Sequence, residues 1–441
     1  MCVISLGVIF EREGVGAMNF EVAVLFAIPA FMLLMVLEFV WSKFKGPDTW
    51  HHQADAVSSI SSGLTYLVLR TLGFGVLVIS YDWVAQQIAV AEPVVTGFWL
   101  YVLVFVWKDF TSYWMHRWAH ASSFLWAMHL IHHSSEEFNL AVALRQNAFN
   151  WFSYGGLMLL PLALIGVPAE VVAVVLPIQF FMQFWYHTQH VGKLGWLEYV
   201  IVTPSQHRVH HAINPRYIDK NFGQIFCWDR LFGTFQSELK EDPPAYGITT
   251  PVRHYNPVMI ELNYMGRLLR DALATRRWRD KLGVFFSRTG WRPEDVSERR
   301  PLQKIDYRDA SQKFSRQQPS WLVVWSWLHL GLLLGLAAFT LASIGSLADA
   351  VKVGLLVYVL LGVAVNAQQL MLEAALALDG LRFGLVGALA YFGAGDSVLG
   401  SSMLLPMLVF ISLCSLTVSR RSSKLVSGGV PPTVNLNPAG K

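Results

Sequence analysis

The sequence is short of charged residues. Only 15% of its 441 residues are Asp, Glu, Lys or Arg, whereas a typical soluble chain has about 25%. Hydrophobic residues make up 54%, and the mean hydropathy is +0.41. This composition excludes an ordinary cytosolic domain, a disordered chain and a collagen-like fibre. It indicates a protein that lies mostly in a lipid bilayer.

Cysteine is also scarce. Three scattered residues, Cys2, Cys227 and Cys414, exclude a disulfide framework and a metal site built from cysteine. There is no glycine-rich loop of the kinds that bind nucleotides or dinucleotides. Residues 1–17 lack the basic start and the cleavage site of a signal peptide, and Met18 is an alternative start.

Long apolar runs predict an all-α, polytopic membrane protein, because about 20 apolar residues span a bilayer as a helix. The expected spans are Asn19–Trp41, Ser58–Tyr81, Gly97–Met115, Asn147–Gly166, Pro168–Tyr186, Trp321–Ile344, Val353–Leu372, a short Phe383–Gly395 and Leu399–Val418. Basic residues place the adjoining ends in the cytoplasm by the positive-inside rule. They are Lys43, Lys45, Arg382, Arg420 and Arg421.

These runs divide the chain into five parts. We expect an N-terminal anchor span (1–54), a catalytic domain (55–240), a basic cytoplasmic amphipathic segment (241–320), a C-terminal transmembrane block (321–419) and a disordered tail (420–441).

Basic residues gather in 201–320, which holds 20 Lys and Arg against 13 Asp and Glu. No nucleic-acid-binding motif accompanies this charge, so we expect a cytoplasmic membrane face and no nucleic-acid partner. Within it, Met259–Phe286 has the pattern of a basic amphipathic helix. Such a helix lies on the bilayer surface or packs on the soluble part of the protein.

Ten of the fourteen histidines fall into four tight groups. The groups are His116 and His120; His129, His132 and His133; His187 and His190; and His207, His210 and His211. Residues at i, i+3 and i+4 share a face of a helix. We therefore expect each triplet to offer up to three imidazoles to one point.

So many imidazoles predict a metal site, because imidazole suits iron, copper, zinc and nickel. One zinc ion takes at most four ligands, so two metal ions fit the number better. The four remaining histidines are expected to be ordinary interfacial residues. They are His51, His52, His254 and His329.

The motifs around these histidines resemble those of the membrane-bound fatty acid hydroxylase and sterol desaturase superfamily, in its alkylglycerol monooxygenase-like branch. The stretches that carry the resemblance are 132–140, 143–146, 183–188, 203–211, 219–221 and 228–235. It covers roughly residues 55–235, nearly half of the chain. In that branch an acidic residue follows the second histidine, where this chain has Ala121.

The resemblance implies an integral-membrane monooxygenase with two non-haem irons at the cytoplasmic face. It would use O2 to hydroxylate lipid alkyl chains and cleave alkylglycerol ethers to fatty aldehydes. It implies that the ligands are the clustered histidines, with His190 the least secure of the ten. Residues beside the metal or substrate would be Glu136, Glu137, Asn139 and Arg145. Electrons would come from an external donor, either tetrahydrobiopterin or a reductase.

Other functions fit the same sequence. A sterol, fatty-acid or carotenoid hydroxylase or desaturase needs the same cluster. From other classes, the histidines could serve a zinc-dependent lipid hydrolase or a metal transporter. Transport predicts ionisable residues along several spans, whereas these histidines gather at one face. Asp109, near the inner end of a span, is expected to face inward and to pair with Arg117 or a clustered histidine.

Overall fold

The protein is helical throughout the part of the chain that the computed structural model describes. That part is residues 20–72, 81–91, 95–148, 157–309, 313–373, 375–393, 396, 398–399 and 403–427. Within it there is no β-strand, and three isolated bridges are the only β-type pairing. The all-α prediction is confirmed. The tail expected to be disordered is 420–441, but residues 420–427 belong to the helix Leu404–Ser427. Residues 428–441 and the alternative starts at Met1 and Met18 lie outside the described residues.

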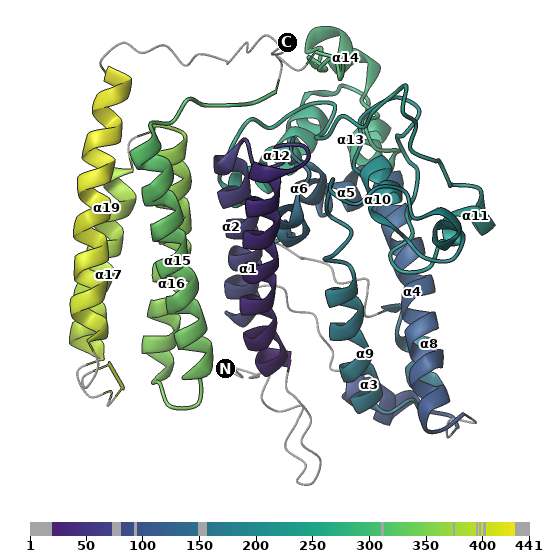
Figure 1. Ribbon diagram of the computed structural model, residues 1–441, viewed down its shortest axis with the longest axis horizontal. Coiled ribbons are helices and arrows are strands. Elements are labelled where there is room, and N and C mark those ends of the chain that lie inside the picture. Colours follow the sequence, from purple (N-terminus) through teal and green to yellow (C-terminus); the bar gives the residue numbers. More distant parts are fainter. Residues whose placement is uncertain are drawn as a thin grey trace.

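The first part of the chain combines long helices with short ones that bring polar groups together. Its helices are α1 (Phe20–Phe44), α2 (Gln53–Thr71), α3 (Tyr81–Ile88), α4 (Phe98–Ala121), α5 (Ser123–Ala127), α6 (Leu130–His133), η2 (Leu140–Leu144), α8 (Leu160–Leu164), α9 (Ala169–Met182), η3 (Gly195–Tyr199), α10 (Pro204–His210) and α11 (Trp228–Phe232). The short helices α5, α6, α10 and α11 lie at one end of the long ones, as Figure 1 shows.

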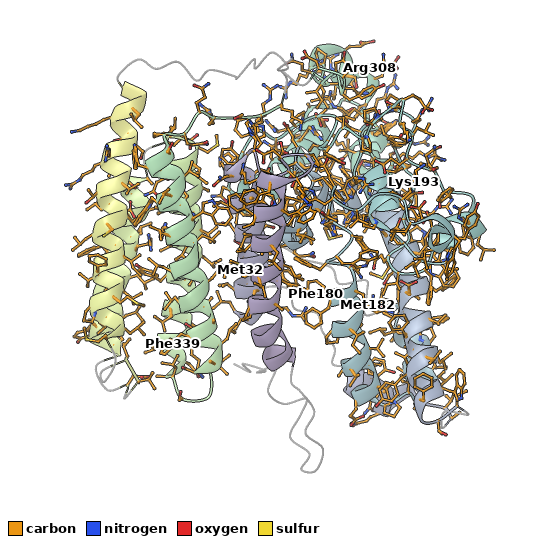
Figure 2. The ribbon with its side chains drawn as sticks, in the orientation of Figure 1. Met32, Phe180, Met182, Lys193, Arg308 and Phe339 are labelled. Carbon is orange, nitrogen blue, oxygen red and sulfur yellow. The ribbon has the colours of Figure 1, made fainter. Side chains whose placement is uncertain are left out.

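The two ends of the molecule differ in character. Figure 2 shows polar side chains gathered around the short helices, where Lys193 and Arg308 lie, while Met32 and Phe339 lie along the long helices. We call the end of the molecule that holds the short helices α5, α6, α10 and α11 the polar end. The helix α1 runs toward it and ends at Phe44.

The second part of the chain supplies the candidate membrane spans. Its helices are α12 (Pro257–Ala274), α13 (Trp278–Phe286), α14 (Glu294–Arg299), α15 (Ser320–Ala342), α16 (Asp349–Leu370), α17 (Leu376–Phe392) and α19 (Leu404–Ser427). Among the described residues, α15, α16 and α19 are long and apolar enough to cross a membrane. The α9 helix is apolar but shorter, at 14 residues.

The C-terminal helices pack directly on the first part of the chain. One hydrophobic core joins Val57, Ile60 and Leu64 of α2 to Leu333 of α15 and Val359 of α16. Within the C-terminal block, α15 and α16 approach each other closely, because a Cβ on Gly362 would lie 2.5 Å from the Leu333 side chain. Burial of this apolar surface holds the C-terminal block against α2.

A buried polar cluster lies inside that block, and it corrects two expectations. Arg382 does not lie at the cytoplasmic surface: it is fully buried in α17, 3.6 Å from Asp379. Ser415 and Ser419 of α19 donate hydrogen bonds to Asp379. His329 is not interfacial, because it is fully buried in α15 and stacks on Trp325. A charged pair is tolerated among apolar helices only when its members are paired and hydrogen-bonded.

The helix expected over Met259–Phe286 is two helices. The first of them, α12, ends because Thr275 takes an extended conformation. Asp295 stabilises this break by accepting hydrogen bonds from the Thr275 hydroxyl and the Arg276 amide. One face of α12 packs in a core with α6, so contact with the soluble part is confirmed. Contact with a bilayer stays a prediction.

Replacing Asp379 with alanine should destabilise the protein, because the charge of Arg382 is then buried without its carboxylate. Breaking a buried ion pair costs about 3–5 kcal/mol. We expect a clearly lower thermal unfolding midpoint for the purified full-length variant in detergent. The matched control is Asp349→Ala, because Asp349 also pairs within a single turn but is 87% exposed. Equal midpoints for the two variants would show that the buried pair does not stabilise the block.

Candidate metal centre

Three helices and one loop bring histidines together at the polar end. The helix α10 begins at Pro204, a residue that suits the first turn because its missing N–H would have no partner there. It carries His207 and His210, and His211 caps it. The helices α4 and α6 and the loop after α9 supply the rest.

The histidines form two groups, and within each the candidate ligand atoms lie within 4.8 Å of one another. The first group is His116, His120, His129, His133 and His210; the second is His132, His187, His207 and His211. Nine of the ten predicted ligands are therefore brought together. Eight of the nine come from only three helical segments, α4, α6 and α10, with the residues at their ends.

The expectation that each triplet serves one point is wrong. His129 and His133 belong to the first group, and His132 belongs to the second. Likewise, His207 and His211 face the second group while His210 faces the first. Adjacent helical residues point about 100° apart, so neighbours such as His132 and His133 cannot meet at one point. Each triplet instead bridges the two groups.

Backbone carbonyls fix the orientation of several rings. The Nδ1 atoms of His116, His187 and His210 lie 2.8, 3.0 and 2.9 Å from the carbonyl oxygens of Phe222, Gln183 and Lys220, respectively. The Nδ1 of His132 lies 3.2 Å from the Arg145 carbonyl. A carbonyl only accepts hydrogen bonds, so Nδ1 carries the proton and Nε2 presents a lone pair.

The Nε2 atoms point at one another. In the second group they are 2.9 Å apart between His207 and His187, and 3.1 Å between His211 and His132. In the first group, His210 and His133 are separated by 3.1 Å. Nitrogens that bind one ion at about 2.1 Å with ordinary bond angles stand about 3.0–3.4 Å apart. Converging lone pairs at these distances fit a bound metal ion.

Burial keeps these rings neutral. Loss of hydration and the neighbouring imidazoles hold the pKa of His132 at about 3. The same two causes hold the pKa values of His133, His207 and His211 well below the ordinary value of 6.5. Metal ligation requires neutral imidazole, so the group is in the binding form at neutral pH.

A loop after α10 supplies two of the orienting carbonyls. Asp219 and Asn221 have positive φ values of 59° and 56°, which Asp and Asn tolerate better than most residues. Asp229 accepts hydrogen bonds of 2.7 Å from the amides of Phe222 and Gly223. The carboxylate of Asp229 thereby fixes the Phe222 carbonyl that holds His116.

Two buried acids outside the histidine motifs brace the site. Asp109 faces inward as predicted, but the predicted partners are wrong: it accepts hydrogen bonds from the amides of Ile225 and Phe226 and from the Trp228 indole. Arg117 instead donates to the Tyr113 hydroxyl.

Glu38 of α1 is the second of these buried acids. It accepts hydrogen bonds from the Leu140 amide and from the hydroxyl of Thr188, the neighbour of His187. Sequence reasoning missed Glu38 because an acid in an apolar run gives no sign of a partner about 100 residues away.

His190, the tenth predicted ligand, lies in neither group. Its ring is partly exposed, with Nε2 3.4 Å from the Thr49 hydroxyl and Nδ1 close to Gly46. The stretch after His187 is not helical, so the spacing of three residues does not place the two rings on one face.

The four other predicted site residues have different surroundings. Arg145 is buried and forms a 2.6 Å ion pair with Asp55, and its carbonyl orients His132. Asn139 caps η2 and donates to the Thr49 carbonyl.

The two glutamates face residues 313–314. Glu136 accepts a hydrogen bond from the Phe314 amide, and Glu137 lies 3.5 Å from Lys313. Burial raises the pKa of both to about 7. Backbone carbonyls, rather than these acids, take the outer N–H groups of His116, His132, His187 and His210.

A cavity of about 310 Å³ adjoins the histidines. Rings of both groups line it, including His116 and His129 of the first and His132, His187 and His207 of the second. Aromatic residues from α1, α2 and the region of α9 also line the cavity. They include Phe31, Tyr66, Phe180 and Phe184, and Figure 2 shows Phe180 between α1 and α9. Arg145 lines the cavity, whereas Glu136, Glu137, Asn139 and Ala121 are not among its lining residues.

Removing one ligand should lower metal content. We expect His210→Ala and His211→Ala each to lose bound metal, measured as metal per chain by mass spectrometry of the purified protein. His190→Ala is the control and should retain the wild-type content. Full metal in both cluster variants would contradict the assignment.

Removing a residue that holds a ligand in place should weaken metal binding less than removing the ligand itself. Asp229→Asn cannot accept from both the Phe222 and Gly223 amides, so the Phe222 carbonyl is less firmly held. Losing such a partner typically costs 10–100-fold in metal affinity, and we expect about ten-fold in a chelator competition. Asp396→Asn is the control, because the Asp396 carboxylate likewise accepts from backbone amides, those of Ala348 and Val398, but lies in the C-terminal block. Equal metal affinities of the Asp229 variant and the control would show that Asp229 does not support a ligand.

Comparisons with known proteins point to the same family that the histidine motifs resemble. The family model described as fatty acid hydroxylase matches residues 101–234. Alkylglycerol monooxygenase of Homo sapiens is 36% identical over 275 residues, 60% of this chain and 59% of the relative. That of Xenopus tropicalis is 33% identical over 310 residues, 69% of this chain and 67% of the relative. That of Danio rerio is 37% identical, with 60% and 59% covered.

The chain thus spans about three fifths to two thirds of the length of these relatives. No solved structure matches it significantly. The matched segment, residues 101–234, contains all nine histidines of the two groups, and the predicted resemblance is confirmed. The chain belongs to the fatty acid hydroxylase family, in the branch that contains the alkylglycerol monooxygenases.

Proposed function

We propose that this protein is an integral-membrane di-iron monooxygenase that hydroxylates lipid alkyl chains with O2, and that its substrates are alkylglycerol ethers. The observation that carries the proposal is the cavity, because imidazoles of both groups and large apolar side chains line it together. Relatives named alkylglycerol monooxygenase support the choice of substrate.

The two histidine groups would each hold one iron ion. Bound iron would supply activation of O2 and the oxidising power to insert one oxygen atom into a C–H bond. Carbonyls that accept from Nδ1 hold the imidazoles aimed at each iron position, so little reorganisation would be needed. Iron fits a donor set of imidazoles without cysteine.

The cavity wall would position the alkyl chain. Phe31, Tyr66 and Phe184 present ring surface to it, and apolar surface excludes water from the reacting carbon. Asn147 lines the same cavity, and its buried side-chain oxygen has no hydrogen-bond partner among the residues that the structure describes. It can accept a hydrogen bond from a hydroxyl of a neutral glycerol headgroup.

Hydroxylation of the carbon beside the ether oxygen gives a hemiacetal, which collapses to a fatty aldehyde and a glycerol hydroxyl. The second oxygen atom of O2 leaves as water and takes up two electrons and two protons. An external donor must supply those electrons, and we propose tetrahydrobiopterin or a reductase. The partners are thus a bilayer lipid, O2 and this donor.

We further propose a multi-pass topology with the metal centre at the cytoplasmic face. Support comes from basic residues at the helix ends that lie at the polar end: Lys43 in the last turn of α1, Lys45 just after it, and Arg420 and Arg421 in α19. Lysine and arginine near span ends favour the cytoplasmic side.

The test is release of fatty aldehyde from an alkylglycerol by membranes that contain the full-length protein, with air and reduced pterin. We expect aldehyde that requires both O2 and the donor, and more than about 100-fold less from His132→Ala. His190→Ala is the matched control and should keep activity. Aldehyde or glycerol formed without O2 would contradict an oxygenase. Hydroxylated sterol or fatty acid without ether cleavage would contradict the substrate alone.

A further inference from the structure

The helix α12 is apolar on two opposite faces. Its inner face packs through Ile260, Tyr264 and Leu268 against Leu130 and Ile131 of α6. Its outer face carries further large apolar residues, at spacings of three, seven and four, that nothing in the described part of the chain covers. They are Met259, Leu262, Leu269 and Leu273, which are 47%, 44%, 50% and 80% exposed.

The next helix continues this pattern. On α13, Trp278, Leu282 and Phe286 recur every four residues and are 74%, 61% and 73% exposed, while Val284 faces the core. We call the seven exposed residues of α12 and α13 the outer stripe. So many large apolar side chains at helical spacing mark an interaction surface rather than scattered surface residues.

Arginines flank the outer stripe. Arg270, Arg276, Arg277 and Arg279 are all exposed. The ion pair between the Arg277 guanidinium and the exposed Glu294 carboxylate is weak, because the two groups are 3.9 Å apart. An apolar helical face with a tryptophan, bordered by cations, is typical of a helix that lies in the plane of an anionic membrane surface.

The position of α12 and α13 in the fold also suits contact with a membrane surface. Figure 1 shows α12 and α13 at the level where α1 ends and α15 begins, which is where spans leave the hydrocarbon region. A second copy of the chain is a poorer occupant, since a symmetric interface would bring the same arginines of both copies together.

We propose that the outer stripe docks on the anionic lipid headgroups of the leaflet at the polar end. The inner face of α12 packs on α6, which carries His132 and His133. Docking therefore holds the metal centre at a fixed depth relative to that leaflet. The proposal stands independently of the substrate and of the reaction.

The test uses the full-length protein reconstituted in nanodiscs. Cys2 and Cys414 are replaced by serine, Cys227 is left because it is buried, and Leu282→Cys carries an environment-sensitive fluorophore. We expect lipids with a spin label on the acyl chain to quench it at least about two-fold more strongly than a fluorophore on Glu298→Cys, an exposed position on α14. Quenching should be stronger with phosphatidylglycerol than with phosphatidylcholine alone.

A charge variant separates the contribution of the arginines to membrane binding from that of the apolar residues. Replacing Arg276, Arg277 and Arg279 together by glutamine should remove the dependence on anionic lipid. Equal, weak quenching at both positions would overturn the proposal. Crosslinking of Leu282→Cys between chains, without quenching by lipid, would assign the outer stripe to a second copy and overturn it as well.

Discussion

The rest of the site depends on one electrostatic requirement: several neutral imidazoles turn their Nε2 lone pairs toward one another at about 3 Å. Such an arrangement is unfavourable without a cation, so the fold must hold it in place. It does so through carbonyls that accept from Nδ1, and these carbonyls lie on segments that are themselves fixed by buried acids such as Asp109 and Asp229. The acids are hydrogen-bonded to backbone amides rather than to the rings.

Helical geometry explains why two groups form rather than one. Two triplets with the pattern His-x-x-His-His lie at α6 and α10, and adjacent histidines in each diverge by about 100°. Each triplet therefore contributes to both groups, which places the groups side by side and lets one cavity touch both. Aromatic residues from α1, α2 and the region of α9 also line that cavity, so the apolar helices and the polar end build it together.

The sequence predicted the helical class, the gathering of nine histidines and the family, because all three depend on local spacing and composition. It did not predict which histidine joins which group, since that depends on the direction of each ring. His190 and His329 were misjudged for related reasons: His190 follows an irregular turn, and His329 lies in a polar cluster built from four helices. Partners far apart in sequence, such as Glu38 with Thr188 and Asp379 with Ser415, leave no local pattern.

The central claim is that nine imidazoles form two adjacent metal sites. Iron X-ray absorption on the full-length protein, purified and loaded with ferrous iron without air, tests it most directly when combined with iron content per chain. The account predicts two irons per chain, each surrounded mainly by imidazole nitrogens and with a second iron close by. One iron per chain, or a set of ligands that contains sulfur, would contradict it.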